Sequence, residues 1–246
     1  MDSPAVALTP SIQSHRIPRW GWGVLAVGLL LYGVLLGTHV GAYAGGSDSS
    51  GYINNARLLA EHRVQIERRA LPGLPPEKAR PYTYVPLGFI PVQERDMVPT
   101  YPVGVSLLIV GVSQVVGWEA APNVMMWLHG VMGVVLLFAL AREAGLSFPM
   151  SLLATLLLAI SPLYLFMSVQ AMSDTPSLTW CAAAVWFAWQ SRRNARWAVA
   201  VGAATAIAVL VRPSNLLIML PVSICLGVDW RRWLWLGIGA APGAIF

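Results

Sequence analysis

The chain has 246 residues, of which 57% are hydrophobic and only 11% are charged, and its mean hydropathy is +0.63. Because a soluble domain carries about 25% charged residues, this composition excludes an ordinary soluble protein and predicts one that lies in a lipid bilayer. The net charge of +5 is not interleaved with aromatic residues as it is in a nucleic-acid groove. We therefore expect no nucleic-acid partner and interpret the basic residues as determinants of membrane topology.

The N-terminal segment 1–19 contains proline and serine without hydrophobic periodicity. It predicts a disordered cytoplasmic tail that brings Arg16 and Arg19 to the membrane. The apolar run that begins at Trp20 is about 20 residues long and exceeds the apolar core of a signal peptide. We therefore expect an uncleaved transmembrane module over 20–246. Since the sequence stops inside an apolar segment, we also expect a C-terminal truncation.

Eight apolar segments predict the helices of this module. A helix needs about 20 residues to cross the hydrocarbon core, and several of these segments are shorter. The predicted fold class is an all-α polytopic membrane protein with about seven transmembrane helices and further juxtamembrane helices on the outer face. The segments are 20–40, 103–117, 122–141, 148–169, 177–190, 197–211, 214–228 and 233–246.

Basic residues in alternate loops predict which loops are cytoplasmic. The N-terminal tail joins them only if segment 103–117 enters the outer leaflet without crossing. The long loop 41–121, Asp174 and Arg212 then share the outer side. Seven Lys and Arg in the long loop favour the opposite arrangement, but the rule weakens for loops of about 60 residues, so we favour the partial helix. The basic loop residues are Arg142, Arg192, Arg193, Arg196, Arg231 and Arg232.

Two kinds of structure are expected within the long loop. Residues 52–61 have helical spacing, which predicts a short interfacial helix with Asp48 at its start. Residues 71–102 contain eight prolines and little periodicity, so we expect an irregular, packed cover.

An ordered set of short motifs resembles the GT-C glycosyltransferases, in the branch of the protein O-mannosyltransferases and lipid A aminoarabinose transferases. The set covers about 40–215, and its members are individually weak. They are Gly46-Ser47-Asp48, the following helix with Arg57, Tyr101-Pro102-Val103-Gly104, Arg142-Glu143-Ala144-Gly145 and Ser173-Asp174.

The resemblance implies a hexosyl- or pentosyltransferase that takes a sugar from a polyprenyl-phosphate-linked donor. The acceptor would be a lipid, a glycan or a protein, and the enzyme would be a multi-pass protein of the cell (inner) membrane with its active site facing the periplasm or exterior. It also implies a partial helix after the first outer loop. Two features depart from the family pattern: Tyr101-Pro102-Val103 lacks the usual Pro-Pro pair preceded by a charged residue, and the C-terminal half is absent.

Glycosyl transfer needs a base for the acceptor hydroxyl and positive charge for the phosphate leaving group. We predict Asp48 as the catalytic base; alternatively it caps a helix that begins near Ser50. Asp174 is predicted to bind substrate, and it also fits a helix start before Pro176. Asp48 and Asp174 could together hold Mg²⁺ or Mn²⁺, although two ligands are few.

Three further residues are predicted to bind substrate. Arg212 fits the donor phosphate, or else it only extends to the membrane interface. Arg57 could act similarly or lie on a solvated helix face, and Tyr101 could pack near the sugar. Cys181 and Cys225 lie in apolar stretches without metal-ligand spacing and are expected to pack in the core.

Two other classes of function stay open from the sequence. In a transporter, charged groups would line a pathway near the membrane midplane, often within internal repeats. We find no repeat, and the predicted spans are nearly free of charge. A non-catalytic scaffold subunit would need none of the boundary charges. The enzyme is the favoured interpretation.

Overall fold

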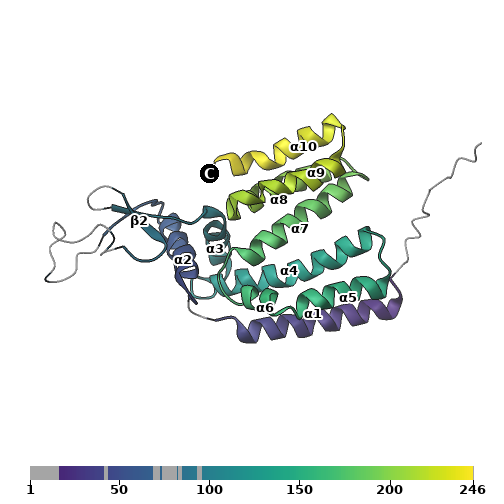
Figure 1. Ribbon diagram of the computed structural model, residues 1–246, viewed down its shortest axis with the longest axis horizontal. Helices are drawn as coiled ribbons and strands as arrows, with labels where there is room; N and C mark the ends of the chain where they lie inside the picture. The colour runs from purple at the N-terminus through teal and green to yellow at the C-terminus, as the bar shows by residue number, and fades with distance from the viewer. Residues whose placement is uncertain are drawn as a thin grey trace, which may run out of the picture.

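The computed structural model describes residues 17–41, 44–68, 73, 82, 85–92 and 96–245. The predicted tail before Ile17, including Arg16, lies outside this part of the chain. The described residues form a layered bundle of antiparallel helices with a smaller loop region at one end (Figure 1). Each of the eight apolar segments contains helix, as predicted. The helices of the bundle are α1 (Arg19–His39), α4 (Ala121–Glu143), α5 (Phe148–Ala159), α6 (Pro162–Ser168), α7 (Asp174–Ser191), α8 (Trp197–Val211), η3 (Pro213–Ile218), α9 (Met219–Leu226), α10 (Trp230–Ala240) and η4 (Ala241–Ile245).

Two of the described helices, α1 and α4, are long and apolar enough to cross a membrane by themselves. A third span results if α5 and α6 are counted as one, with a bend of 62° between them. These helices and the shorter apolar ones agree with the predicted class, an all-α membrane protein, to which the described residues add one small sheet. The prediction of about seven spans stays a prediction.

The two ends of the bundle carry different chemistry (Figure 1). One end, here called the loop end, holds the long loop and the beginnings of α4 and α7. The opposite end, here called the basic end, holds the turns that follow α4, α7 and α9, where the predicted cytoplasmic arginines lie. This separation follows from the antiparallel run of successive helices, which returns every second turn to the same end.

Helix α3 (Val103–Val116) lies at the loop end beside α2 (Ser47–Ala60). Its 14 residues span about 21 Å, less than the hydrocarbon core of about 30 Å. Gly104 lets α3 approach the end of α8 closely, because a Cβ at this position would overlap the backbone of Leu210 and Val211. This contact brings Arg212, the residue that follows α8, close to the first turn of α3.

Helix α2 begins earlier than its periodicity predicts, at Ser47 rather than near Ser50. Its buried face includes Tyr52 and Ala56, which pack in one apolar cluster with Val105 and Ile109 of α3. The Ser106 hydroxyl also donates a hydrogen bond to the Tyr52 carbonyl at 2.9 Å. The two juxtamembrane helices are therefore packed together as one unit.

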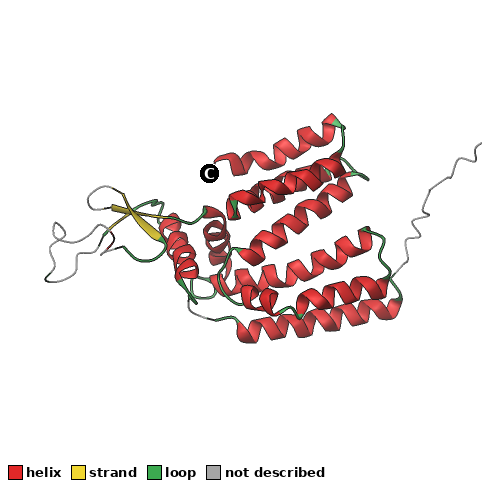
Figure 2. Ribbon diagram, viewed as in Figure 1, coloured by secondary structure: helices red, strands yellow, loops and turns green. Residues whose placement is uncertain are grey.

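The expectation of irregular structure throughout 71–102 is wrong in part. Strand β3 (Asp96–Pro99) pairs antiparallel with β2 (Phe89–Val92) and with the short β1 (Ile66–Glu67), in the order β1-β3-β2. Figure 2 shows this sheet beyond α2. Proline concealed the pattern in the sequence. Pro91 is tolerated because β2 is an edge strand, where one side of the backbone needs no partner.

Candidate functional site

Asp48 lies in the first turn of α2, whose N-cap residue is Gly46, so Asp48 is inside the helix and is not its N-cap. Its carboxylate instead accepts a hydrogen bond from the Tyr101 hydroxyl at 2.5 Å and one from the Ser47 hydroxyl at 3.1 Å. Helix capping therefore does not account for this carboxylate. Its position in the first helical turn is nonetheless favourable, since the helix dipole stabilises negative charge there.

Tyr101 is held against α2 by glycine. A Cβ at Gly51 would overlap the Tyr101 ring, and Gly88, with φ +89°, lies against both Gly51 and the Tyr101 ring. The rings of Tyr101 and Tyr52 are 4.9 Å apart. The hydrogen bond to Asp48 raises the pKa of Tyr101, and burial adds to this effect. Tyr101 therefore keeps its proton at neutral pH and stays a donor to Asp48.

Arg212 and Asp174 form an ion pair between the end of α8 and the start of α7. The Arg212 Nη2 lies 2.9 Å from the Asp174 Oδ1, and the Arg212 Nε donates to the Ser173 hydroxyl at 2.8 Å. The two side chains are 42% and 35% exposed, so both stay accessible. Ser173 is the N-cap of α7 but makes no side-chain capping bond; its hydroxyl orients Arg212 instead.

Tyr52 connects these two groups. Burial raises the pKa of Tyr52 above its usual value, while a hydrogen bond with Ser173 and the positive charge of Arg212 act in the opposite direction. The charges of Asp48 and Asp174 also raise this pKa. Tyr52 packs in one apolar cluster with Ala171 and Val211, and the Ser49 hydroxyl lies 3.6 Å from the Met172 sulfur, so the start of α2 lies close to the segments that carry Asp174 and Arg212. The structure brings together four of the five predicted site residues, namely Asp48, Tyr101, Asp174 and Arg212.

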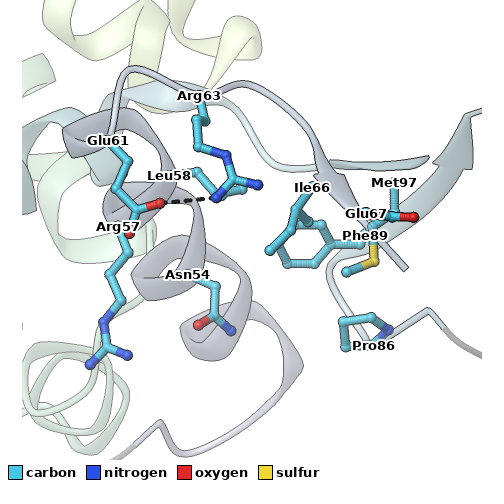
Figure 3. A pocket seen from close by; sticks show the side chains of 10 residues that line it. All are labelled: Asn54, Arg57, Leu58, Glu61, Arg63, Ile66, Glu67, Pro86, Phe89 and Met97. Carbon is cyan, nitrogen blue, oxygen red and sulfur yellow. Dashed lines mark hydrogen bonds and ion pairs between the residues drawn. The ribbon is translucent and has the colours of Figure 1, made fainter. Parts of the chain in front are cut away.

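Arg57 lies elsewhere. It lines a cavity of about 590 Å³ between the second half of α2 and the small sheet, together with Asn54, Glu61, Phe89 and others (Figure 3). Glu61 in this cavity pairs with Arg63 at 3.2 Å. Asp48 does not line this cavity, and within the described part of the chain Arg57 forms no ion pair with Asp48 or Asp174. Its predicted role in substrate binding stays a prediction.

The carboxylates proposed for a metal ion are already engaged, Asp48 by two hydroxyls and Asp174 by Arg212. In the described part of the chain, no three His, Cys, Asp or Glu side chains group together. Mg²⁺ takes about six oxygen ligands in octahedral geometry, so these two carboxylates do not form such a site by themselves. The predicted need for Mg²⁺ or Mn²⁺ stays a prediction.

Two members of the cluster, Tyr52 and Ser173, were not predicted from the sequence. Tyr52 belongs to the apolar face of α2, and hydrophobic periodicity alone does not indicate a role for its hydroxyl. Ser173 stood inside the Ser173-Asp174 motif and could have been singled out, because a hydroxyl beside a carboxylate is a ready partner for an arginine side chain.

Removing only the Tyr101 hydroxyl tests whether it orients Asp48. A hydrogen bond to a charged group contributes about 1.5–3 kcal/mol, and each 1.36 kcal/mol of barrier corresponds to about tenfold in rate. We expect Tyr101→Phe to lower the rate of the glycosyl transfer that the sequence predicts by about tenfold, while the protein still inserts and folds. Tyr82→Phe, on an exposed side chain, is the control. Equal activity of the two variants would show that the hydrogen bond is not used in the reaction.

The family model of the dolichyl-phosphate-mannose-protein mannosyltransferases matches residues 100–244, more than half of the 246 residues. The matched part includes Tyr101, Asp174 and Arg212, whereas Asp48 precedes it. No curated protein and no solved structure matched the chain.

Proposed function

The chain belongs to the dolichyl-phosphate-mannose-protein mannosyltransferase family, and on that premise we propose that it transfers a sugar from a polyprenyl-phosphate-linked donor to an acceptor. The observation that carries this proposal is the cluster around Tyr52. A carboxylate held by Tyr101 and a partly exposed arginine lie at the two sides of the apolar cluster that contains Tyr52 and Val211. These are the two charges that transfer from a lipid phosphate requires.

In the proposed step, an acceptor hydroxyl attacks the anomeric carbon of the donor sugar. The new bond joins the acceptor oxygen to that carbon, and the bond between the carbon and the phosphate oxygen breaks. The hydroxyl proton passes to the Asp48 carboxylate, and the electron pair leaves with the polyprenyl phosphate. Arg212 stabilises the negative charge on the departing phosphate, while Asp174 and Ser173 hold the guanidinium in place.

The donor sugar is a hexose or a pentose in this proposal. Polyprenyl-phosphate mannose is the first donor to test, since the description of the matching family names mannose. Transfer of radiolabelled mannose from this donor by membranes that contain the protein would support the proposal. If neither a hexose nor a pentose is transferred from any polyprenyl-phosphate donor, the protein is a scaffold or a transporter rather than an enzyme.

We further propose that the loop end faces outward from the inner membrane. The arginines of the basic end favour the cytoplasm for that end, and the small-sheet region then lies in the periplasm or exterior. The orientation can be tested by cysteine labelling of a variant in which Cys181 and Cys225 are replaced by serine. A cysteine at the exposed position Val64 should react with an impermeant maleimide in intact cells, whereas one at the exposed position Asn194 should react only after lysis. The reverse pattern would place the site in the cytoplasm.

A further inference from the structure

The turns that follow α7 and α9 lie side by side at the basic end (Figure 1). Ala188 of α7, Ala198 of α8 and Leu226 of α9 are buried in one apolar cluster, which places the ends of these helices together. Helix α10 also packs closely on α8, because a Cβ at Gly202 would overlap the Leu236 backbone. The exposed side chains in and beside both turns therefore belong to one surface at this end of the bundle.

This surface has more arginines than its carboxylates can neutralise. Arg193 pairs with Glu143 at 2.8 Å, and Arg232 pairs with Asp229 at 3.3 Å. Within the described part of the chain, three further guanidinium groups in and beside the two turns form no ion pair and no hydrogen bond, and all three side chains are exposed. They belong to Arg192, Arg196 and Arg231. The surface therefore presents positive charge that the described residues do not compensate.

Two of these guanidinium groups lie over tryptophan rings. The Arg192 guanidinium carbon is 5.6 Å from the centroid of the Trp189 ring, and that of Arg231 is 5.9 Å from the Trp230 centroid. Such a cation–π contact leaves the N–H groups in the guanidinium plane available for a phosphate. Trp230 is also 67% exposed, and exposed tryptophans are typical of the layer in which phospholipid headgroups lie. The charges and rings of this surface thus match the headgroup layer of a bilayer.

The beginning of α10 is fixed against the turn that precedes it. The Asp229 side chain accepts a hydrogen bond from the Arg231 backbone at 3.1 Å, and the Trp233 indole donates to the Gly227 carbonyl at 2.9 Å. These contacts engage only the backbone of Arg231. The folded structure therefore holds Arg231 at the end of the bundle and leaves its side chain available to a ligand.

The side of α10 that carries Arg231 continues as an apolar face. Leu234 and Ile238 follow it three and seven residues later, which places all three side chains on one side of the helix. Leu234 is 53% exposed and Ile238 is 49% exposed. At a rise of about 1.5 Å per residue, this face extends about 10 Å from the charge. A phosphate at Arg231 with hydrocarbon chains along Leu234 and Ile238 fits the shape of a phospholipid.

We infer that the basic end binds an anionic phospholipid, whose phosphate lies at Arg231 and whose acyl chains follow Leu234 and Ile238 along α10. Arg192 and Arg196 add positive charge to the same surface and so favour a headgroup without a cation. A zwitterionic lipid has the same phosphate, but these arginines repel its choline group. In the orientation proposed above, the bound lipid belongs to the cytoplasmic leaflet. The inference does not depend on sugar transfer.

Native mass spectrometry of the detergent-purified protein tests this inference, in titrations with phosphatidylglycerol or phosphatidylcholine. We expect the parent protein to bind phosphatidylglycerol more tightly. Arg231→Gln should weaken that binding about fivefold, the usual contribution of one arginine at an anionic membrane surface, and should leave phosphatidylcholine binding unchanged. Because the Arg231 side chain forms no hydrogen bond within the part of the chain that the structure describes, this variant should fold as the parent does.

Arg193→Gln is the matched control, since it removes one positive charge from the same end. The Arg193 guanidinium already binds both carboxylate oxygens of Glu143, at 3.0 and 2.8 Å, so it offers fewer donors to a phosphate. This variant should bind phosphatidylglycerol as the parent does. An equal loss of binding in Arg231→Gln and Arg193→Gln would show that diffuse charge attracts the lipid, and it would overturn the inference.

Two further results would also overturn it. One is equal binding of phosphatidylglycerol and phosphatidylcholine by the parent protein. The other is displacement of phosphatidylglycerol by inorganic phosphate, which would show an anion site that does not recognise a lipid. None of these measurements requires a sugar donor, so an absence of sugar transfer would overturn the proposed function alone.

Discussion

Replacement of Asp48 by asparagine is expected to reduce sugar transfer by about 10²–10⁴-fold, which is the usual contribution of a general base. Asparagine has the same shape and can still accept the hydrogen bond that Tyr101 donates. It cannot take the proton of the acceptor hydroxyl. The structural cost is small, since the loss of a negative charge in the first turn of a helix costs about 0.3–1 kcal/mol. The measurements are the rate of transfer from a polyprenyl-phosphate donor and the amount of membrane-inserted protein.

Asp229→Asn is the matched control for this experiment. Asp229 is the N-cap of α10 at the basic end, where its side chain accepts a hydrogen bond from the Arg231 backbone. Asparagine caps helices about as well as aspartate, so this variant should keep full activity. If Asp48→Asn retains activity within a few-fold of the parent, Asp48 is structural. The assignment of a general base to α2 would then be abandoned.

Arg212→Gln is expected to lower transfer by about 10²–10³-fold, the cost of removing one donor that stabilises a developing negative charge. Asp174 loses its partner, but its side chain is 35% exposed and can be solvated. The loss of folding stability should therefore stay near the value for a surface ion pair, about 0–1 kcal/mol. The measurement is kcat and KM for the donor, together with the thermal unfolding of the purified protein.

Arg212→Lys separates charge from geometry. Lysine keeps the positive charge but has no planar fork, so it cannot bind Ser173 and Asp174 as Arg212 does and still present a third donor. We expect activity between those of the parent and of Arg212→Gln. The control is Arg193→Gln at the basic end, where Arg193 pairs with Glu143 at 2.8 Å; it should leave transfer unchanged. Full activity of Arg212→Gln would show that Arg212 does not stabilise the donor phosphate.

Much of the helical framework could be predicted from the sequence. The apolar segments became helices because a backbone in hydrocarbon must satisfy its own hydrogen bonds. The basic residues of the short loops after α4, α7 and α9 gather at one end because successive helices reverse direction. The boundary residues Asp48, Asp174 and Arg212 could be singled out for the same reason, since a charge next to a long apolar segment is costly unless it has a purpose.

Two local predictions failed where proline and glycine make the pattern ambiguous. The residues Phe89–Val92 and Asp96–Pro99 form strands although each contains a proline, because edge position and strand ends tolerate the missing N–H. Helix α2 begins at Ser47, ahead of the apolar positions from Tyr52 onward on which the prediction rested. In both places the neighbouring element, rather than local propensity, decides the structure.

The sequence by itself determined that this chain is a helical membrane module of a glycosyltransferase family, with ionisable residues at the ends of its apolar segments. Only the tertiary structure decided which of them meet. Tyr101 reaches Asp48 across 53 positions of sequence, and Ser173 reaches Arg212 across 39, whereas Arg57 lies at another cavity. Periodicity shows which face of a helix is apolar. The partner of a polar side chain is set by the helix packed opposite, and that packing is a property of the whole bundle.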